Sequence, residues 1–181
     1  MTATAPTCEQ LDAGRLNVRC ADGNTYHVRR IRPSDAPLIV RGYDALPDEH
    51  KWFRVLHTLP RLTERMAHDF CTPDPDTVIA VVVEGRDHFA GELVGSARVA
   101  GVGPGQSAEF SITVRPEVSG LGLARQALEI VIQCAREAGC KSVWGTISMH
   151  NARMLGLARR IGFDLRRDPD DISLMIAELE F

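Results

Sequence analysis

Ser119-Gly120-Leu121-Gly122-Leu123-Ala124-Arg125 is the stretch of sequence that decides the fold. Residues 108–114, just before it, alternate apolar and polar side chains as a strand does. Residues 123–138 repeat apolar side chains at helical spacing. The order is therefore strand, glycine-rich loop and helix. Such a loop turns several backbone N–H groups toward one point, where small residues and the helix dipole favour an anion such as a pyrophosphate.

Two common phosphate-binding patterns fit this loop poorly. A Rossmann fingerprint requires a small residue three places after its second glycine, and this chain has Arg125 there. A P-loop requires Gly-Lys-Ser/Thr at the start of the helix, and the stretch has none. The interpretations that remain are a different pyrophosphate-binding loop and a plain tight turn.

Length and composition predict one globular domain. The chain has 181 residues, of which 44% are hydrophobic, and this is enough for one sizeable core. The net charge of −3 argues against a dedicated nucleic-acid binder. No apolar run is long enough to span a membrane, and the first residues lack the apolar segment of a signal peptide. We expect a flexible tail over residues 1–14, one domain over residues 15–181, and neither nucleic acid nor a membrane as a partner.

The cysteines are scattered through the chain and form no close pair. An odd number without Cys-x-x-Cys spacing indicates neither a zinc site nor a disulfide framework. We therefore expect no metal, reduced thiols and a cytoplasmic location. The five cysteines are Cys8, Cys20, Cys71, Cys134 and Cys140.

Strand and helix signals continue on both sides of the glycine-rich loop. The segment from residue 108 to residue 148 reads as a βαβ unit. The last predicted strand, residues 172–179, could offer a pairing edge to a second copy, so a homodimer is possible. Further strands are expected over residues 16–20, 26–31, 77–84, 92–102 and 163–165, and further helices from residue 34, over residues 62–70 and over residues 151–161.

The glycine-rich stretch and its flanks resemble the GNAT superfamily of N-acyltransferases. In that family an acyl-CoA loop, Gln/Arg-x-x-Gly-x-Gly/Ala, follows a strand that ends in Val-x-Pro. Here Val114-Arg115-Pro116 precedes Ser119-x-x-Gly122-x-Ala124. Ser119 departs from the family pattern, which removes one side-chain contact but keeps the backbone amides. The segment from Asn151 to Phe163 is similar to the later Asn…Gly-Phe motif of the family, whose asparagine approaches the pantetheine arm of CoA.

Two earlier segments resemble the GNAT portion of bacterial protein-lysine acetyltransferases of the Pat type. They are Arg30-x-Arg32-Pro33-x-Asp35 and Phe53 followed by Leu59-Pro60-Arg61-Leu62-Thr63. The resemblance implies an α+β (mixed α/β) fold. Its central mixed, largely antiparallel sheet of about six to seven strands is splayed at the cofactor site and flanked by about four helices. In long Pat enzymes this portion follows an acyl-CoA-synthetase-like region, which this sequence lacks, and we expect no regulation through such a region.

The same resemblance implies acetyl-CoA as co-substrate and assigns residues to it. Parallel strands that splay apart leave backbone groups free for the pantetheine amides. Asn151 has a second, compatible interpretation as the N-cap of the following helix. The expected cofactor-binding residues are Ile112, Thr113, Val114, Ser119, Gly120, Leu121, Gly122, Leu123, Ala124, Arg125 and Asn151.

Glu109 is the residue that we expect to act as catalytic base. An acceptor amine with a pKa near 10.4 is mostly protonated at neutral pH, so a base must take its proton directly or through water. Glu109 lies on the strand that the cofactor should run beside, and Pat-like domains carry their catalytic glutamate in the same Ala-Glu-Phe context. The alternative is a carboxylate paired with an arginine of the next strand, such as Arg98. Glu84 and Glu92 are weaker candidates at strand ends.

The acceptor side leaves several alternatives open. Trp52 and Phe53 either line the acceptor groove or pack in the core. Many GNAT enzymes have a tyrosine seven residues after the asparagine to protonate the leaving thiolate, and this chain has Ala158 there. In its absence, either water protonates the thiolate or the thiolate leaves without a proton. We interpret His150 as a surface residue rather than as a base. The function that we expect is acetyl transfer to a protein lysine. A small amine acceptor and a non-catalytic acetyl-CoA-binding module are the alternatives.

Overall fold

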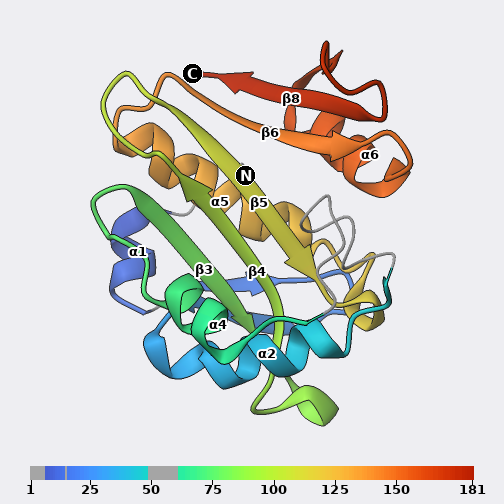
Figure 1. Ribbon diagram of the computed structural model, residues 1–181. Coiled ribbons are helices and arrows are strands. Elements are labelled where there is room, and N and C mark those ends of the chain that lie inside the picture. The colour runs from blue at the N-terminus through green and yellow to red at the C-terminus, as the bar shows by residue number, and fades with distance from the viewer. Residues whose placement is uncertain (1–6, 15, 49–60) are drawn as a thin grey trace.

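The computed structural model describes residues 7–14, 16–48 and 61–181, and its centre is one eight-stranded sheet with the order β1-β2-β3-β4-β5-β6-β8-β7 (Figure 1). The strands are β1 (Leu16–Arg19), β2 (Thr25–Arg30), β3 (Val78–Glu84), β4 (Leu93–Ala100), β5 (Ser107–Val114), β6 (Ser142–Ser148), β7 (Asp164–Arg167) and β8 (Leu174–Glu180). The helices in the described ranges are α1 (Cys8–Asp12), α2 (Ala36–Asp44), α4 (Glu64–Cys71), α5 (Leu123–Glu137) and α6 (Ala152–Ile161).

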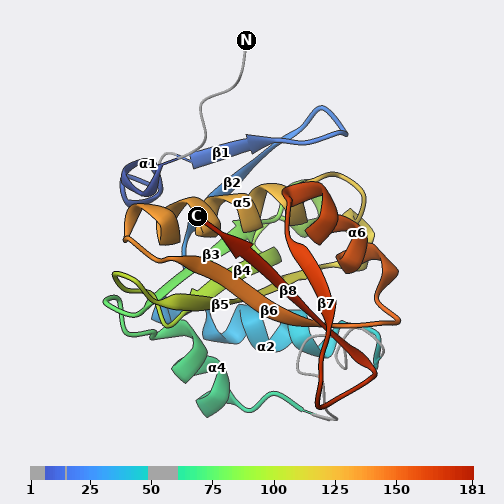
Figure 2. The same cartoon turned by 90° about the horizontal axis from the view of Figure 1, so that it is seen from above.

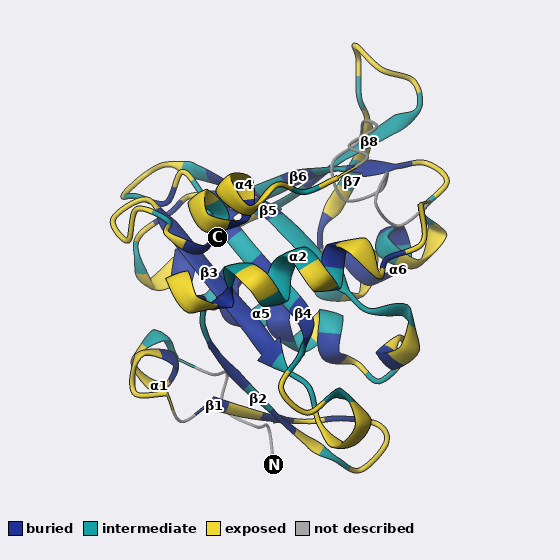
Figure 3. Cartoon of the chain, turned by 60° about the horizontal axis from the view of Figure 1, so that its bottom comes forward, coloured by how far each residue is buried: buried dark blue, intermediate teal, exposed yellow. Residues whose placement is uncertain are grey.

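The central strands lie between two layers of helices. Figure 2 shows β3, β4 and β5 with α5 on one side and with α2 and α4 on the other. β3 is buried on both faces, as Figure 3 shows, and this explains its nearly continuous run of valine and isoleucine. Val81 and Val83 belong to the larger core that includes α5. Ala80 and Val82 belong to the smaller core against α2.

The βαβ unit predicted around the glycine-rich loop is confirmed. β5 and β6 are parallel and are joined through α5, but their pairing stops at Glu109 and Trp144. β5 continues beside β4 to Val114, and β6 continues beside β8 to Ser148. The two parallel strands therefore part over their second halves, as the GNAT resemblance implies.

An aromatic side chain fills the place where β5 and β6 begin to part. The ring of Phe110 lies so close to Gly145 of β6 that a Cβ atom there would be 2.8 Å from it. The same ring makes an edge contact with Phe163 at 5.1 Å between centroids. Gly145 is thus required by the close approach of Phe110 rather than by an unusual backbone angle.

The fold class is confirmed, and two expectations about the strands are corrected. The sheet has eight strands rather than the six or seven that the resemblance implies, and its short edge strands β1 and β7 are those expected near residues 16–20 and 163–165. β8 is not an edge strand, since it pairs with β6 on one side and with β7 on the other. A homodimer stays a prediction, but the edge of β8 that suggested it is covered by β7.

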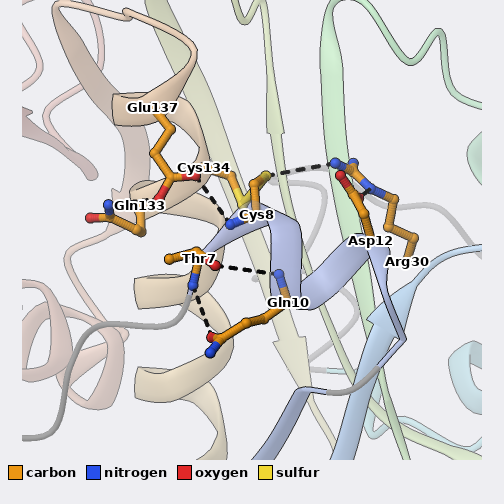
Figure 4. The surroundings of a disulfide bond; sticks show 8 residues. All are labelled: Thr7, Cys8, Gln10, Asp12, Arg30, Gln133, Cys134 and Glu137. Carbon is orange, nitrogen blue, oxygen red and sulfur yellow. Dashed lines mark hydrogen bonds and ion pairs between the residues drawn. A yellow bond between two sulfur atoms is a disulfide. The ribbon is translucent and has the colours of Figure 1, made fainter.

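The expectation of a loose tail is wrong for residues 8–12, which form α1. The helix has a capping box, in which the Thr7 hydroxyl accepts from the Gln10 N–H at 3.3 Å and the Gln10 side chain accepts from the Thr7 N–H (Figure 4). α1 packs against β2 and α5, and it buries Leu11. Residues 8–12 thus pack on the rest of the domain.

Cys8 and Cys134 form a disulfide that joins α1 to α5 (Figure 4). The expectation of reduced thiols is therefore wrong for these two residues, whereas Cys20, Cys71 and Cys140 are free and buried. The pair is separated by 126 residues, so no local spacing could indicate it. The cytoplasmic location stays a prediction.

A buried ion pair fixes the start of α2 against the sheet. Arg29 of β2 donates to both carboxylate oxygens of Asp35 at 2.8 Å, and to Glu84 of β3 at 2.6 Å. The backbone N–H of Arg32 also donates to Asp35. The hydrogen bond to Asp35 is the main reason why the pKa of Arg29 is raised above its ordinary value. Arg32 and Asp35 belong to the segment that resembles Pat-type enzymes, and their role in this fold is to position α2.

Candidate active site

A cleft of about 1160 Å³ opens where β5 and β6 part. Its walls come from the end of β5, residues 118–125, the end of β6 and the first turns of α6. All the predicted cofactor-binding residues except Leu121 line this cleft. The structure therefore brings the glycine-rich loop, the strand end and Asn151 to one place.

The glycine-rich loop presents free backbone donors to the cleft. Gly120 and Gly122 have φ angles of +87° and +88°, a conformation that favours glycine, and Gly122 is the N-cap of α5. Within the described residues, no acceptor is found for the N–H groups of residues 120–125. The Leu121 carbonyl accepts a hydrogen bond from the Ala21 N–H, and the side chains of Leu121 and Leu123 pack in the core, so both residues anchor the loop. Free N–H groups at a helix N-terminus suit an anion.

The end of β5 offers further unsatisfied groups. The Arg115 N–H donates to the Val94 carbonyl of β4. Because bonding alternates along an antiparallel pair, the backbone groups of Ile112 and Val114 face the β6 side, where β6 has moved away. The buried hydroxyl of Thr113 has no hydrogen-bond partner in the part of the chain that the structure describes. These groups fit the amides of a pantetheine arm, since each could then be satisfied.

Helix α6, which follows β6 in the chain, forms part of the cleft wall on the β6 side. The Asn151 side chain accepts from the Met154 N–H at 3.0 Å, so its N-cap role is observed. Arg153 donates to the Ser119 hydroxyl at 3.3 Å, and this links α6 to the residue that departs from the family loop. Arg153 and Arg160 both line the cleft and were not predicted. Arg153 lies in the first turn and Arg160 in the last turn of α6, so their place on the predicted helix was the only available signal.

A second cavity of about 460 Å³ lies on the face of β4 and β5 that α2 and α4 cover. α2 and α4 form its outer wall, and its lining is mostly apolar. The two cavities share four residues of β5, and so they meet along one strand. The shared residues are Glu109, Phe110, Ser111 and Thr113.

Glu109 lies at this junction with its side chain exposed. Within the described ranges, no hydrogen bond or ion pair engages its carboxylate, and Arg98 is not its partner. The two rival carboxylates are engaged elsewhere, because Glu84 pairs with Arg29 and Glu92 pairs with Arg115. Neither rival lines either cavity. Of the three candidates, Glu109 is the one that lines the two cavities.

The other predicted residues have mixed positions. Trp52 and Phe53 lie outside the described residues. Ala158 is buried and carries no donor, whereas His150 is exposed at the rim of the cleft. Tyr43 is buried in the wall of the second cavity. Its place on the apolar face of the helix expected from residue 34 was a signal for its burial, but not for a cavity.

Neither a metal site nor a membrane segment is found in the described ranges. No group of three or more His, Cys, Asp or Glu side chains lies close enough to hold a metal ion among residues 7–14, 16–48 and 61–181. In the same ranges, no helix has the length and apolar character that crossing a bilayer requires.

Comparison with known proteins gives consistent matches. Residues 26–164 match the family model described as an acetyltransferase (GNAT) domain. An acetyltransferase of Pseudomonas aeruginosa is 27% identical over 160 residues, which cover 87% of this chain and 85% of the relative. The L-methionine sulfoximine/L-methionine sulfone acetyltransferase of the same organism is 35% identical over 80 residues, 42% of this chain and 46% of the relative. The solved GNAT domain of S. lividans PAT superposes with a TM-score of 0.83 at 25% identity, covering 92% of this chain and 96% of that domain.

Proposed function

The chain belongs to the GNAT family of acetyltransferases, and from this premise we propose that it transfers the acetyl group of acetyl-CoA to a primary amine, a protein lysine. The single observation that carries the proposal is the meeting of the two cavities on β5, beside Glu109. A cofactor in the larger cleft and an amine in the smaller cavity would come together along that strand. The likeness to the GNAT domain of PAT supports the lysine acceptor.

Each part of the larger cleft has a proposed role toward acetyl-CoA, which supplies an acetyl thioester. The free N–H groups of residues 120–125 would bind the pyrophosphate. The outward-facing backbone groups of Ile112 and Val114 would bind the pantetheine amides. Two side chains could also hydrogen-bond to the pantetheine arm. They are the hydroxyl of Thr113, which has no partner among the described residues, and the amide nitrogen of Asn151, whose side-chain oxygen already accepts from the Met154 N–H.

Glu109 is the proposed general base. Its carboxylate takes a proton from the acceptor ammonium, directly or through one water. The neutral nitrogen then bonds to the acetyl carbon as the carbon–sulfur bond breaks, and the second proton that this nitrogen loses passes to water or to the departing sulfur. The electron pair of that bond leaves on the sulfur of CoA. Ala158 has no proton to give, so water protonates the thiolate or it departs as an anion.

A small-molecule amine is the second candidate acceptor. The relative that acts on L-methionine sulfoximine is 35% identical over less than half of this chain. The smaller cavity, at about 460 Å³, is within the size range of pockets for small ligands. Both observations favour a compact acceptor, and the choice between the two classes is an experimental one.

The test of the proposed function is an acetylation assay with a panel of acceptors. Purified protein and acetyl-CoA are incubated with lysine peptides, whole proteins and small amines, and acetylated product and CoA thiol are both quantified by mass spectrometry. We expect equal amounts of thiol and acetylated amine, with the highest kcat/KM for a lysine acceptor. Saturable acetyl-CoA binding without transfer to any amine would contradict the proposal and would favour a non-catalytic binding module.

A substitution in the loop tests where acetyl-CoA binds. Gly122→Asp places a side chain at a φ of +88° and a negative charge beside the proposed pyrophosphate site. Two like charges about 4 Å apart near a surface repel by roughly 1–4 kcal/mol, so the Kd should rise about 10-fold or more. Isothermal titration calorimetry measures this change, and circular dichroism checks that the fold survives.

Gly105→Asp is the matched control for the loop substitution. Gly105 also has a positive φ, +71°, with open space at its Cβ position, but it does not line the cleft. It should show the same backbone strain with an unchanged Kd. Equal Kd values for Gly122→Asp and the wild type would mean that the loop is only a turn.

A further inference from the structure

Arg98 is a charged side chain on the wall of the smaller cavity. It lies on β4, its side chain is partly buried, and it lines the cavity beside Glu109. Among the residues that the structure describes, no hydrogen-bond acceptor or carboxylate contacts its guanidinium group. The guanidinium group lies over the ring of Phe70, whose centroid is 5.2 Å from the Cζ atom of Arg98.

Two other arginines of the same region have carboxylate partners. Arg115 lines the same cavity and is paired with Glu92 and Glu117. Arg29, on the same sheet, is paired with Asp35 and Glu84. A guanidinium group has five N–H donors. The face of an aromatic ring attracts its positive charge, but it does not accept hydrogen bonds from these donors as a carboxylate does. Burial also lowers the pKa of Arg98, because its charge has lost water without gaining an anion.

The strand register places Arg98 close to the proposed base. Arg98 is opposite Ser111 and Ala100 is opposite Glu109, so Arg98 and Glu109 are diagonal neighbours on one face of the sheet. The Cα atoms of such neighbours lie about 7–8 Å apart. The opposite wall is apolar, with Leu38 and Ile39 of α2. A cation, a carboxylate and an apolar wall thus surround one small space.

We propose that Arg98 binds a carboxylate of the acceptor, so that the acceptor is an amine that also carries an anionic group. This inference rests on the proposed function and names the acceptor class of the same site. Arg98 would hold the carboxylate while Glu109 receives the proton of the amine. The carboxylate has two sources, the acid group of a free amino acid or an acidic side chain near the lysine of a protein.

Pairs of acceptors that differ only in this charge test the proposal. The wild type is assayed with ω-amino acids of increasing chain length and with the corresponding ω-amino amides, which keep the amine and lose the anion. A hydrogen bond between charged groups supports a preference for the acid of roughly 10- to 100-fold in kcat/KM at the best chain length. Arg98→Gln should reduce that ratio to about one and leave the Kd of acetyl-CoA unchanged.

Arg115→Gln is the matched control, because Arg115 lines the same cavity but already has two carboxylate partners. Its ratio of acid to amide should stay at the wild-type value. Lysine peptides with a neighbouring Glu or Gln form a second pair, and a preference for Glu that is larger than any among free amino acids would identify a protein as the source. Equal use of acids and amides by the wild type would overturn the proposal while the transferase function stands. No transfer to any amine would instead contradict the proposed function.

Discussion

Glu109→Gln should lower kcat by about 10²–10⁴-fold and leave the affinity for acetyl-CoA nearly unchanged, because base catalysis usually contributes a factor of this size. The glutamine keeps the shape and a hydrogen-bonding group, but it cannot take a proton from an ammonium at neutral pH. The proposed cofactor contacts are backbone groups of other residues, so binding should survive. Steady-state kinetics and calorimetry measure the two quantities separately.

The pH dependence of this variant distinguishes a base from a structural residue. The acceptor amine has a pKa near 10.4, so raising the pH supplies more of the neutral nucleophile and should recover part of the lost rate. Glu92→Gln is the control, since Glu92 pairs with Arg115 and lines neither cavity. Its kcat should stay within a few-fold of the wild type. A Glu109→Gln variant with normal stability and normal kcat would remove Glu109 from the mechanism.

Asp35→Asn should lower the free energy of unfolding by roughly 3–5 kcal/mol, because it leaves the buried Arg29 without its bidentate partner. Asp35 and Arg29 expose only 3% and 9% of their side chains, so water cannot replace the lost carboxylate. Glu84 remains as a half-exposed partner, so we expect loss of stability rather than complete unfolding. Urea denaturation measures the difference.

An exposed ion pair provides the control for Asp35→Asn. Asp12 pairs with Arg30 with 55% and 37% of the two side chains exposed, and Asp12→Asn should cost about 0–1 kcal/mol. The pH dependence has a definite sign. Asp35 raises the pKa of Arg29 above its unfolded value, which is already strongly basic, so this contribution is fully present below the unfolded pKa and is lost only at higher pH. The deficit of Asp35→Asn should therefore be equal at about pH 7 and about pH 9. Similar losses for both variants would contradict the special role of the buried pair.

The sequence predicted the cofactor side of the fold because the signals there are local. Alternation over residues 108–114, helical spacing over residues 123–138 and the glycines between them fix a strand, a turn and a helix in order. The structure confirms these elements as β5, the loop and α5. A parallel partner for β5 then follows from the handed βαβ connection.

The acceptor side could not be predicted, because it depends on contacts between distant segments. The smaller cavity is built from α2, α4 and the faces of β4 and β5, and no local spacing relates Tyr43 or Arg98 to Glu109. The disulfide joins residues 126 apart, and β8 became an interior strand because the short β7 pairs with its outer edge. Long-range pairing of this kind is set by burial over the whole domain and leaves little trace in a single sequence.

A crystal structure with bound acetyl-CoA tests the central claim most directly. The account predicts the pyrophosphate on the N–H groups of residues 120–125, the pantetheine arm along Ile112 and Val114, and the thioester on the same side of β5 as the Glu109 carboxylate. Acetyl-CoA bound outside the cleft between β5 and β6 would contradict it. So would a thioester on the far side of the strand from the Glu109 carboxylate.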